Sequence, residues 1–299
     1  MTSTESLYLR DLYAEWFQRM ADMDVPTVKD LFEEWHLPAI EPTGVTYEEV
    51  SAGGVPAIWA NPVDAAADRV IVYTHGGGFV AGSSYSHRKL AAHLAKAAGI
   101  RALVVNYRRA PEHKYPSQLD DTEAVHLWLH QEGFEPRHIA AGGDSAGGNL
   151  AVTTSRRLLT HGHPQPAAAI AFSPWIDMEL KGESLDTNDE TDVLVKRGVL
   201  ETMIALFLEG AGNPTDPFVN PLYQDFTGAP PTFIAVSGTE TLYSDSDRLA
   251  AHLRGAGVNV ELLVEPGQQH VYPSLAGRAP EADTAIAKAA AWLRPHLGL

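Results

Sequence analysis

Residues 142–150 read GGDSAGGNL and place one serine, Ser145, among four glycines. Taken alone, this Gly-x-Ser-x-Gly pattern fits a reactive serine or a plain glycine-rich turn equally well. The apolar run Ile139–Ala141 before it predicts a buried strand, and residues 146–160 predict a helix. A serine between a strand and a helix must sit in a sharp, strained turn, with no room for side chains at the flanking glycines. This context favours a nucleophile over a turn.

The composition excludes several classes of protein. The 299-residue chain has a formal net charge of -16, which argues against a binder of nucleic acid or of an anionic membrane surface. The chain has no cysteine, so disulfides, thiolate metal sites and a cysteine nucleophile are all excluded. A small neutral or cationic molecule is the partner that this charge favours.

The N-terminal stretch MTSTESLYLRDLYAEWF carries acidic residues among its apolar ones. It has neither the basic start nor the apolar core of a signal peptide. No apolar run approaches the roughly 18 residues that a membrane-spanning helix needs. We therefore expect a cytoplasmic protein with no membrane partner.

Short apolar runs alternate with helical patterns along most of the chain, which predicts an α/β fold with a mostly parallel sheet covered on both faces. The runs predicted as strands are 45–50, 55–61, 70–73, 102–105, 139–141, 167–172, 232–236 and 258–264. The patterns predicted as helices are 5–22, 27–36, 86–98, 118–132, 146–160, 242–255 and 281–297. Only the turn 52–54 separates the first two strands, so we expect an antiparallel hairpin at one edge of an about eight-stranded sheet.

One interval breaks the alternation of strands and helices. Residues 178–217 begin with the polar stretch KGESLDTNDETD and continue with a helical pattern at Val195–Leu208. This segment is longer than an ordinary loop, so we interpret it as an inserted cap. The expected organisation is one domain, 1–299, whose cap is formed by about 1–42 and the insertion 178–217.

A second glycine-rich stretch, His75-Gly76-Gly77-Gly78, directly follows the strand predicted at 70–73. Consecutive glycines let a loop approach a ligand closely and present its N–H groups. Acyl transfer needs such donors where the carbonyl oxygen becomes negative. We expect this oxyanion hole to use the N–H groups of Gly77, Gly78 and Ala146. Both loops follow parallel strands and should meet at one edge of the sheet.

A serine nucleophile needs a base, and the base needs a carboxylate that holds its orientation. His270 stands out among the 13 histidines because it lies in the loop after the last predicted strand. Glu240 lies in the loop after the preceding strand, and Asp245 shortly beyond it is the alternative acid. The order Ser145…Glu240…His270 is the chain order of α/β-hydrolase triads.

Taken together, the motifs resemble those of the hormone-sensitive-lipase-like family of bacterial carboxylesterases, in the α/β-hydrolase superfamily. The stretches that carry the resemblance are HGGGFVAGS at 75–83, NYRRAPEHKYP at 106–116, GDSAGG at 143–148, SPW at 173–175, NPLYQDFTGAPPTFIAVSG at 220–238 and HVYP at 270–273. The resemblance implies the α/β-hydrolase fold, a helical cap in two parts and a homodimer. The chain departs from the family pattern where Glu240-Thr241-Leu242 replaces the usual Asp-Pro-Leu.

The sequence therefore predicts a carboxylesterase of short- to medium-chain esters that needs no cofactor or metal. A lactonase or amidase on the same triad is an alternative, since the bond that is cleaved depends on the shape of the pocket. A non-catalytic ligand-binding receptor is an alternative of another class. Plant gibberellin receptors resemble the same family but lack the catalytic histidine, whereas His270 is present here. Trp16, Phe17 and Trp35 either line the pocket or pack against the core.

Overall fold

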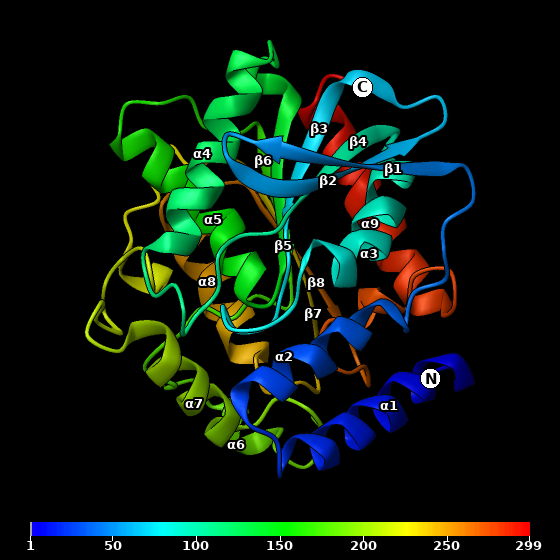
Figure 1. The fold of residues 1–299 in the computed structure, drawn as a ribbon, viewed down its shortest axis with the longest axis vertical. Helices are drawn as coiled ribbons and strands as arrows, with labels where there is room; N and C mark the ends of the chain where they lie inside the picture. The colour runs from blue at the N-terminus through cyan, green and yellow to red at the C-terminus, as the bar shows by residue number, and fades with distance from the viewer. Residues whose placement is uncertain (1) are drawn as a thin grey trace.

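The computed structural model of the protein describes residues 2–299, and their apolar runs form one eight-stranded sheet (Figure 1). The strands are β1 (Val45–Ala52), β2 (Val55–Pro62), β3 (Ala66–Thr74), β4 (Ile100–Val105), β5 (Ile139–Asp144), β6 (Ala168–Phe172), β7 (Thr232–Ser237) and β8 (Val260–Glu265). Their order across the sheet is β1-β2-β4-β3-β5-β6-β7-β8. The strand β5, which precedes Ser145, is therefore central and fully buried.

The direction of the strands follows the prediction. β1 pairs antiparallel with β2 across the predicted turn, and β2 pairs antiparallel with β4. All pairs from β4 to β8 are parallel. The mostly parallel sheet of eight strands is thus confirmed, and the carboxyl ends of β3, β5, β6, β7 and β8 meet at one edge.

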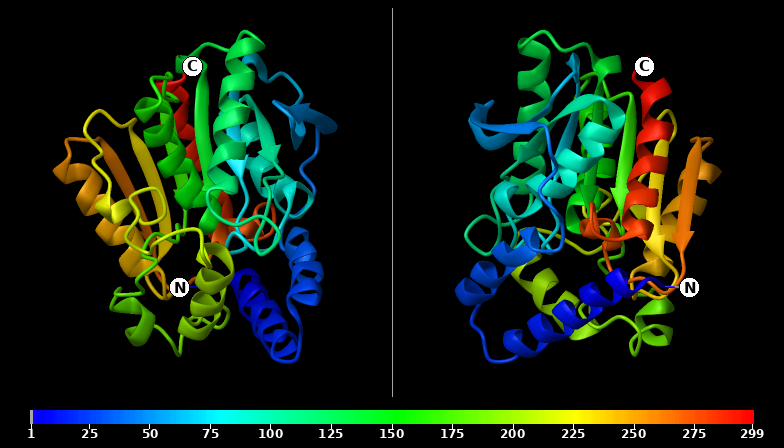
Figure 2. Two further views of the ribbon diagram at one scale, coloured as in Figure 1. Left: turned by 60° about the vertical axis from the view of Figure 1, so that its left-hand side comes forward. Right: turned by 90° about the vertical axis from the view of Figure 1, so that its right-hand side faces the viewer.

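Helices cover both faces of the sheet. They are α1 (Thr4–Met20), α2 (Val25–Phe32), α3 (Ser84–Ala98), α4 (Ser117–Gln131), α5 (Ala146–Thr160), α6 (Ser184–Thr187), α7 (Arg197–Leu208), α8 (Tyr243–Gly255) and α9 (Pro280–His296), with short 3₁₀ turns η1 (Glu33–His36), η2 (Pro136–His138), η3 (Pro221–Tyr223) and η4 (Tyr272–Leu275). α3 and α9 pack together on one face, while α4, α5 and α8 lie on the other (Figures 1 and 2). Strand β7 illustrates the two-sided burial: Phe233 contacts Trp292 of α9, while its neighbour Ile234 packs with Leu249 and Leu253 of α8.

The helices α1, α2, α6 and α7 lie apart from these layers, beyond the carboxyl ends of the parallel strands (Figure 2). The first two come from the N-terminal segment and the others from the segment 178–217. The short α6 was not predicted, because its stretch is polar and has no helical pattern. Contacts with distant residues hold it instead: the N–H of Ser184 donates to Ser244 Oγ at 3.0 Å, and Ser184 Oγ donates to the carbonyl of Thr241.

Candidate active site

Ser145 lies in the turn between β5 and α5, at the carboxyl end of the central strand. Its φ of 51° and ψ of -122° form a conformation that residues other than glycine rarely adopt. A Cβ on Gly143 would overlap the backbone of Gly147, and a Cβ on Gly147 would overlap the backbone of Thr74. The two glycines therefore allow the strand, the helix and the neighbouring loop to close around a strained serine.

The loop His75–Gly78 follows β3 and lies beside Ser145. Gly77 has a φ of 108° and Gly78 a φ of 63°, both in the region that favours glycine. Tyr107 fastens the loop, because its hydroxyl donates to the carbonyl of His75 at 2.7 Å and its ring stacks on the imidazole at 4.1 Å. Within residues 2–299, the N–H groups of Gly77, Gly78 and Ala146 have no hydrogen-bond acceptor. Three N–H donors are thus free at this edge of the sheet.

His270 and Glu240 form a buried pair in the loops after β8 and β7. Nδ1 of His270 lies 2.9 Å from Glu240 Oε1, and the second carboxylate oxygen accepts a hydrogen bond of 2.7 Å from Ser173 Oγ and one of 2.9 Å from the N–H of Ser237. Burial lowers the pKa of His270, but the charge of Glu240 and its hydrogen bond outweigh burial, so the net shift of the pKa is upward. The pairing with Glu240 therefore stabilises the protonated form of the imidazole.

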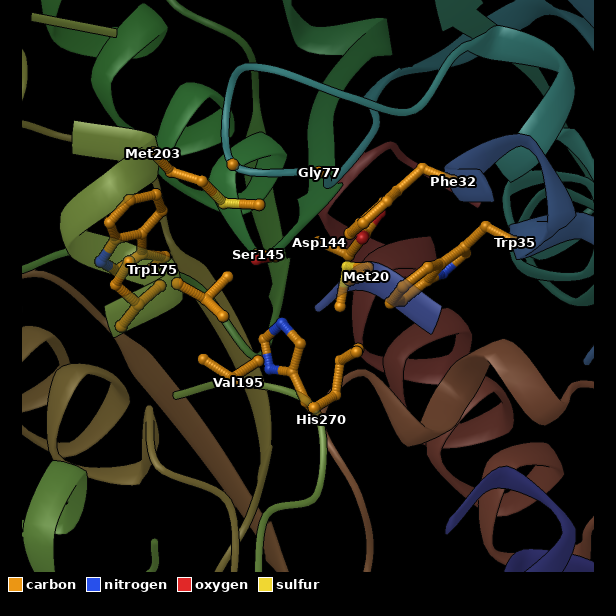
Figure 3. A pocket seen from close by; sticks show the side chains of 14 residues that line it. Met20, Phe32, Trp35, Gly77, Asp144, Ser145, Trp175, Val195, Met203 and His270 are labelled. Atoms are coloured by element: carbon orange, nitrogen blue, oxygen red, sulfur yellow. The ribbon is translucent and has the colours of Figure 1, made fainter. Parts of the chain in front are cut away.

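Ser145, His270, Gly77 and Gly78 all line one hollow (Figure 3). Its remaining walls are mostly apolar and come from the N-terminal segment, from Trp175 and from the insertion. The wall residues are Met20, Phe32, Trp35, Asp144, Trp175, Leu194, Val195, Val199, Leu200 and Met203. An apolar hollow with a few converging polar groups is typical of a small-molecule site.

Comparison with known proteins assigns the chain to a family. Residues 71–274 match the family described as "alpha/beta hydrolase fold". A solved structure of an esterase from the bacterial hormone-sensitive lipase family is 38% identical, and the match covers 100% of both chains with a TM-score of 0.93. The chain belongs to this esterase family.

Other family members share the same length of chain. An acetyl-hydrolase of Streptomyces hygroscopicus is 33% identical over 93% of this chain and 99% of its own. The structure of EstE5 soaked with p-nitrophenyl butyrate is 30% identical, with a TM-score of 0.92 over 99% of this chain and 100% of its own. The match to the EstE5 structure thus spans both the sheet and the helices beyond its edge.

Ser173, which follows β6, is a member of the site that sequence reasoning missed. Its hydroxyl donates to Glu240 Oε2, and its oxygen accepts a hydrogen bond of 3.0 Å from the N–H of Val271. Ser173 is fully buried and has a φ of 46°. It thus joins the loop of the carboxylate to the loop of the imidazole. The SPW stretch at 173–175 was the only signal in the sequence for this residue. Its contacts could not be predicted, because they form only where the ends of three neighbouring strands meet.

Asp144, which directly precedes Ser145, and His87 form a second buried group. Asp144 Oδ1 accepts a hydrogen bond of 2.8 Å from the hydroxyl of Tyr73, and Oδ2 lies 3.3 Å from His87 Nε2. The ring of His75 lies 5.5 Å from that of His87, and burial holds the pKa of His75 well below its usual value. His75 is therefore neutral and serves the glycine loop through its contacts. No signal in the sequence pointed to His87.

The remaining candidates from the sequence are the alternative acid, Asp245, and the aromatic residues Trp16, Phe17 and Trp35. Asp245 accepts hydrogen bonds of 2.7 and 2.8 Å from the N–H groups of Ile176 and Asp177, and it is Glu240 that contacts His270. Of the three aromatic residues considered as candidates, Trp16, Phe17 and Trp35, it is Trp35 that lines the hollow. Trp16 is buried against Tyr13 and Trp35, while Phe17 is 37% exposed.

Two findings concern ligands and membranes. Within residues 2–299, no three histidine, aspartate or glutamate side chains gather closely enough to hold a metal ion. None of the helices in this described part of the esterase is long and apolar enough to cross a bilayer.

Proposed function

We propose that this member of the esterase family is a carboxylesterase that hydrolyses short- to medium-chain esters through Ser145, His270 and Glu240. The observation that carries the proposal is the buried His270–Glu240 pair, whose imidazole lines the same hollow as the strained Ser145. Within this proposal, the N-terminal segment, about 1–42, and the insertion 178–217 form a cap over the hollow. The cap walls are apolar, which suits the hydrocarbon part of an ester.

The first half of the reaction acylates the enzyme. Oγ of Ser145 attacks the ester carbonyl carbon while Nε2 of His270 takes the hydroxyl proton. The carbonyl oxygen becomes an oxyanion and accepts hydrogen bonds from the free N–H groups of Gly77, Gly78 and Ala146. Glu240 stabilises the imidazolium through Nδ1. The imidazolium then gives its proton to the alkoxide oxygen, the C–O bond breaks and the alcohol leaves an acyl-Ser145 ester.

The second half releases the acid. His270 removes a proton from a water molecule, whose oxygen attacks the acyl carbon and forms a second oxyanion in the same hole. The imidazolium returns the proton to Ser145 Oγ as the acyl–oxygen bond breaks. The carboxylic acid departs and the free serine is restored.

Replacing the proposed nucleophile tests this assignment. We expect Ser145→Ala to lower kcat for p-nitrophenyl butyrate by about 10³-fold or more, because no covalent intermediate can form. Ser246→Ala is the matched control, since Ser246 is buried in α8, outside the hollow. Its activity should stay unchanged.

A fluorophosphonate label extends this test to the non-catalytic alternative. The label should attach to Ser145 in the unchanged protein and should fail to attach in Ser145→Ala. Folded Ser145→Ala protein with near-normal turnover would refute the nucleophile, and absence of both turnover and labelling in the unchanged protein would favour a receptor. Rates with lactones and aryl amides beside esters decide which bond the enzyme prefers.

A further inference from the structure

A second hollow adjoins the first, between the N-terminal helices and α7. Its walls include Met23, Val25 and Val28 from the N-terminal segment, Val80 shortly after the glycine loop and Leu206 from α7. Thr202 contributes a hydroxyl, and the other lining side chains are apolar. Such a surface gives no compensation for a charged group and therefore suits a hydrocarbon chain. We refer to this space as the outer hollow.

Three residues line both hollows and form the partition between them: Met20, Val199 and Met203. Met203 packs on the glycine loop, since a Cβ on Gly78 would overlap its sulfur. Figure 3 shows the Met203 side chain reaching from α7 toward Gly77, on the opposite side of the hollow from Met20. The thioether of Met203 thus lies directly beside the N–H donors proposed to hold the oxyanion.

The chemistry of this partition allows it to move. Methionine is unbranched and has three rotatable side-chain bonds, so it adapts its shape at small cost. Valine is stiff about its first side-chain bond and keeps its place. Met203 is only partly buried, so its rotation does not have to displace the core. A rotation away from Gly78 would join the catalytic hollow to the outer one.

We propose that Met203 determines the chain-length specificity of the enzyme, and that the outer hollow receives the far end of a longer hydrocarbon chain of the ester. The proposal rests on the proposed function, since it requires that the ester carbonyl lies between Ser145 and Gly78. With Met203 in place, the short hydrocarbon chains of an ester fill the catalytic hollow, which holds Ser145 and His270. Longer chains must displace its thioether before they reach the outer hollow.

Steady-state rates with a homologous series of esters test the partition. One series of p-nitrophenyl esters, from acetate to palmitate, varies the acyl chain, and one series of alkyl acetates varies the alcohol. We expect the unchanged enzyme to favour butyrate to octanoate. Met203→Ala should raise the ratio of kcat/KM for decanoate to that for butyrate by about tenfold, and Met203→Phe should lower it. The series that responds identifies which chain enters the outer hollow.

Controls separate this effect from general damage to α7. Glu201→Ala changes an exposed residue on the same helix that lines neither hollow, so the ratio should stay at the unchanged value. Met23→Ala removes a methionine from the outer hollow alone and should raise KM for decanoate more than for butyrate. Equal ratios in Met203→Ala and the unchanged enzyme, in both series, would overturn the proposal. The nucleophile is judged separately, because Ser145→Ala would still be inactive in that case.

Discussion

At the scale of single residues, Glu240 is held at both carboxylate oxygens. Oε1 faces the imidazole of His270, while Oε2 accepts from the hydroxyl of Ser173 and from the N–H of Ser237. These three contacts fix the position of the buried carboxylate, which in turn orients the ring. With its extra methylene relative to aspartate, Glu240 reaches the imidazole and both donors at hydrogen-bond distance.

Neutralising this carboxylate tests the proposed acid. We expect Glu240→Gln to lower kcat by about 10³–10⁴-fold, because the amide stabilises neither the imidazolium nor the productive tautomer. Glu240→Asp keeps the charge but shortens its reach, so it should retain more activity than Glu240→Gln. Asp245→Asn is the matched comparison and should keep near-normal kcat. If Asp245→Asn lost more activity than Glu240→Gln, Asp245 would be the acid.

The residues of the site differ in how far the sequence predicts them. Ser145, His270 and Glu240 each follow a predicted strand, so their place along the chain already suggested one meeting point. Ser173 also follows a strand, but its role in the site depends on contacts with residues of two other loops, Glu240 and Val271. His87 lies inside a helix, where nothing local indicates that it faces Asp144. The sequence thus did not predict the contacts between residues of distant elements.

At the scale of elements, the helix α1 is tied to the loop of the proposed base. The hydroxyl of Tyr13 donates to the carbonyl of His270 at 3.1 Å. The start of the helix is fastened to α9, where Glu281 accepts hydrogen bonds from the N–H and hydroxyl of Ser3 and from the hydroxyl of Ser6. The N-terminal segment is therefore anchored at its first turn as well as along its buried face.

Removing the anchor should loosen α1. We expect Glu281→Ala to lower the free energy of local opening of this helix by about 1–2 kcal/mol, because the N-cap Ser3 loses a charged partner. Faster hydrogen exchange of the amides in α1, measured by mass spectrometry, is the readout. Asp11→Ala, at an exposed position in the middle of the same helix, should leave exchange unchanged. Equal exchange in both variants would contradict the anchoring role.

The strands and long helices were predictable because their apolar spacing reflects burial in a sheet or against it. The residues 139–141 marked β5 correctly, although the strand continues to Asp144 through two glycines that have no apolar signal. The helix α6 was missed, since it owes its form to contacts with Ser244 and Thr241. Local pattern thus predicts elements that bury a face, and it fails where tertiary contacts decide.

At the scale of the whole molecule, the alternation of strands and helices sufficed to predict the class and the parallel sheet. The family assignment confirms that prediction and the ester hydrolase class. The homodimer, the cytoplasmic location and the two-part cap stay predictions. The homodimer and the location depend on surfaces and partners, for which apolar spacing carries no signal, whereas the cap was inferred from helical patterns and from the length of the insertion.

The stability of the molecule should depend on pH through Asp245. Burial raises the pKa of this carboxyl to about 7, although the N–H groups of Asp177 and Ile176 act in the opposite direction. The folded protein then binds a proton more tightly than the unfolded chain, whose carboxyl has the ordinary value of 3.8. The stabilisation that the proton supplies is complete below about pH 4 and is lost as the pH rises through 7.

The variant Asp245→Asn isolates this contribution. Its amide oxygen can still accept from the two N–H groups, but the side chain no longer titrates. Urea unfolding at pH 4 and pH 8 should show a weaker pH dependence in the variant, by on the order of 4 kcal/mol at most. Identical pH dependence in the two proteins would show that Asp245 does not titrate in this range.

The crowding around the glycines also predicts where the enzyme tolerates change. Gly76, Gly77, Gly143 and Gly147 have backbone or buried atoms where a Cβ would stand, so random substitutions there should be purged from any library selected for activity. The outward-facing parts of α7 and of the loop after α1 carry no such restriction. A programme of directed evolution for new esters would therefore find its productive diversity in the helices over the sheet edge, with the edge itself kept invariant.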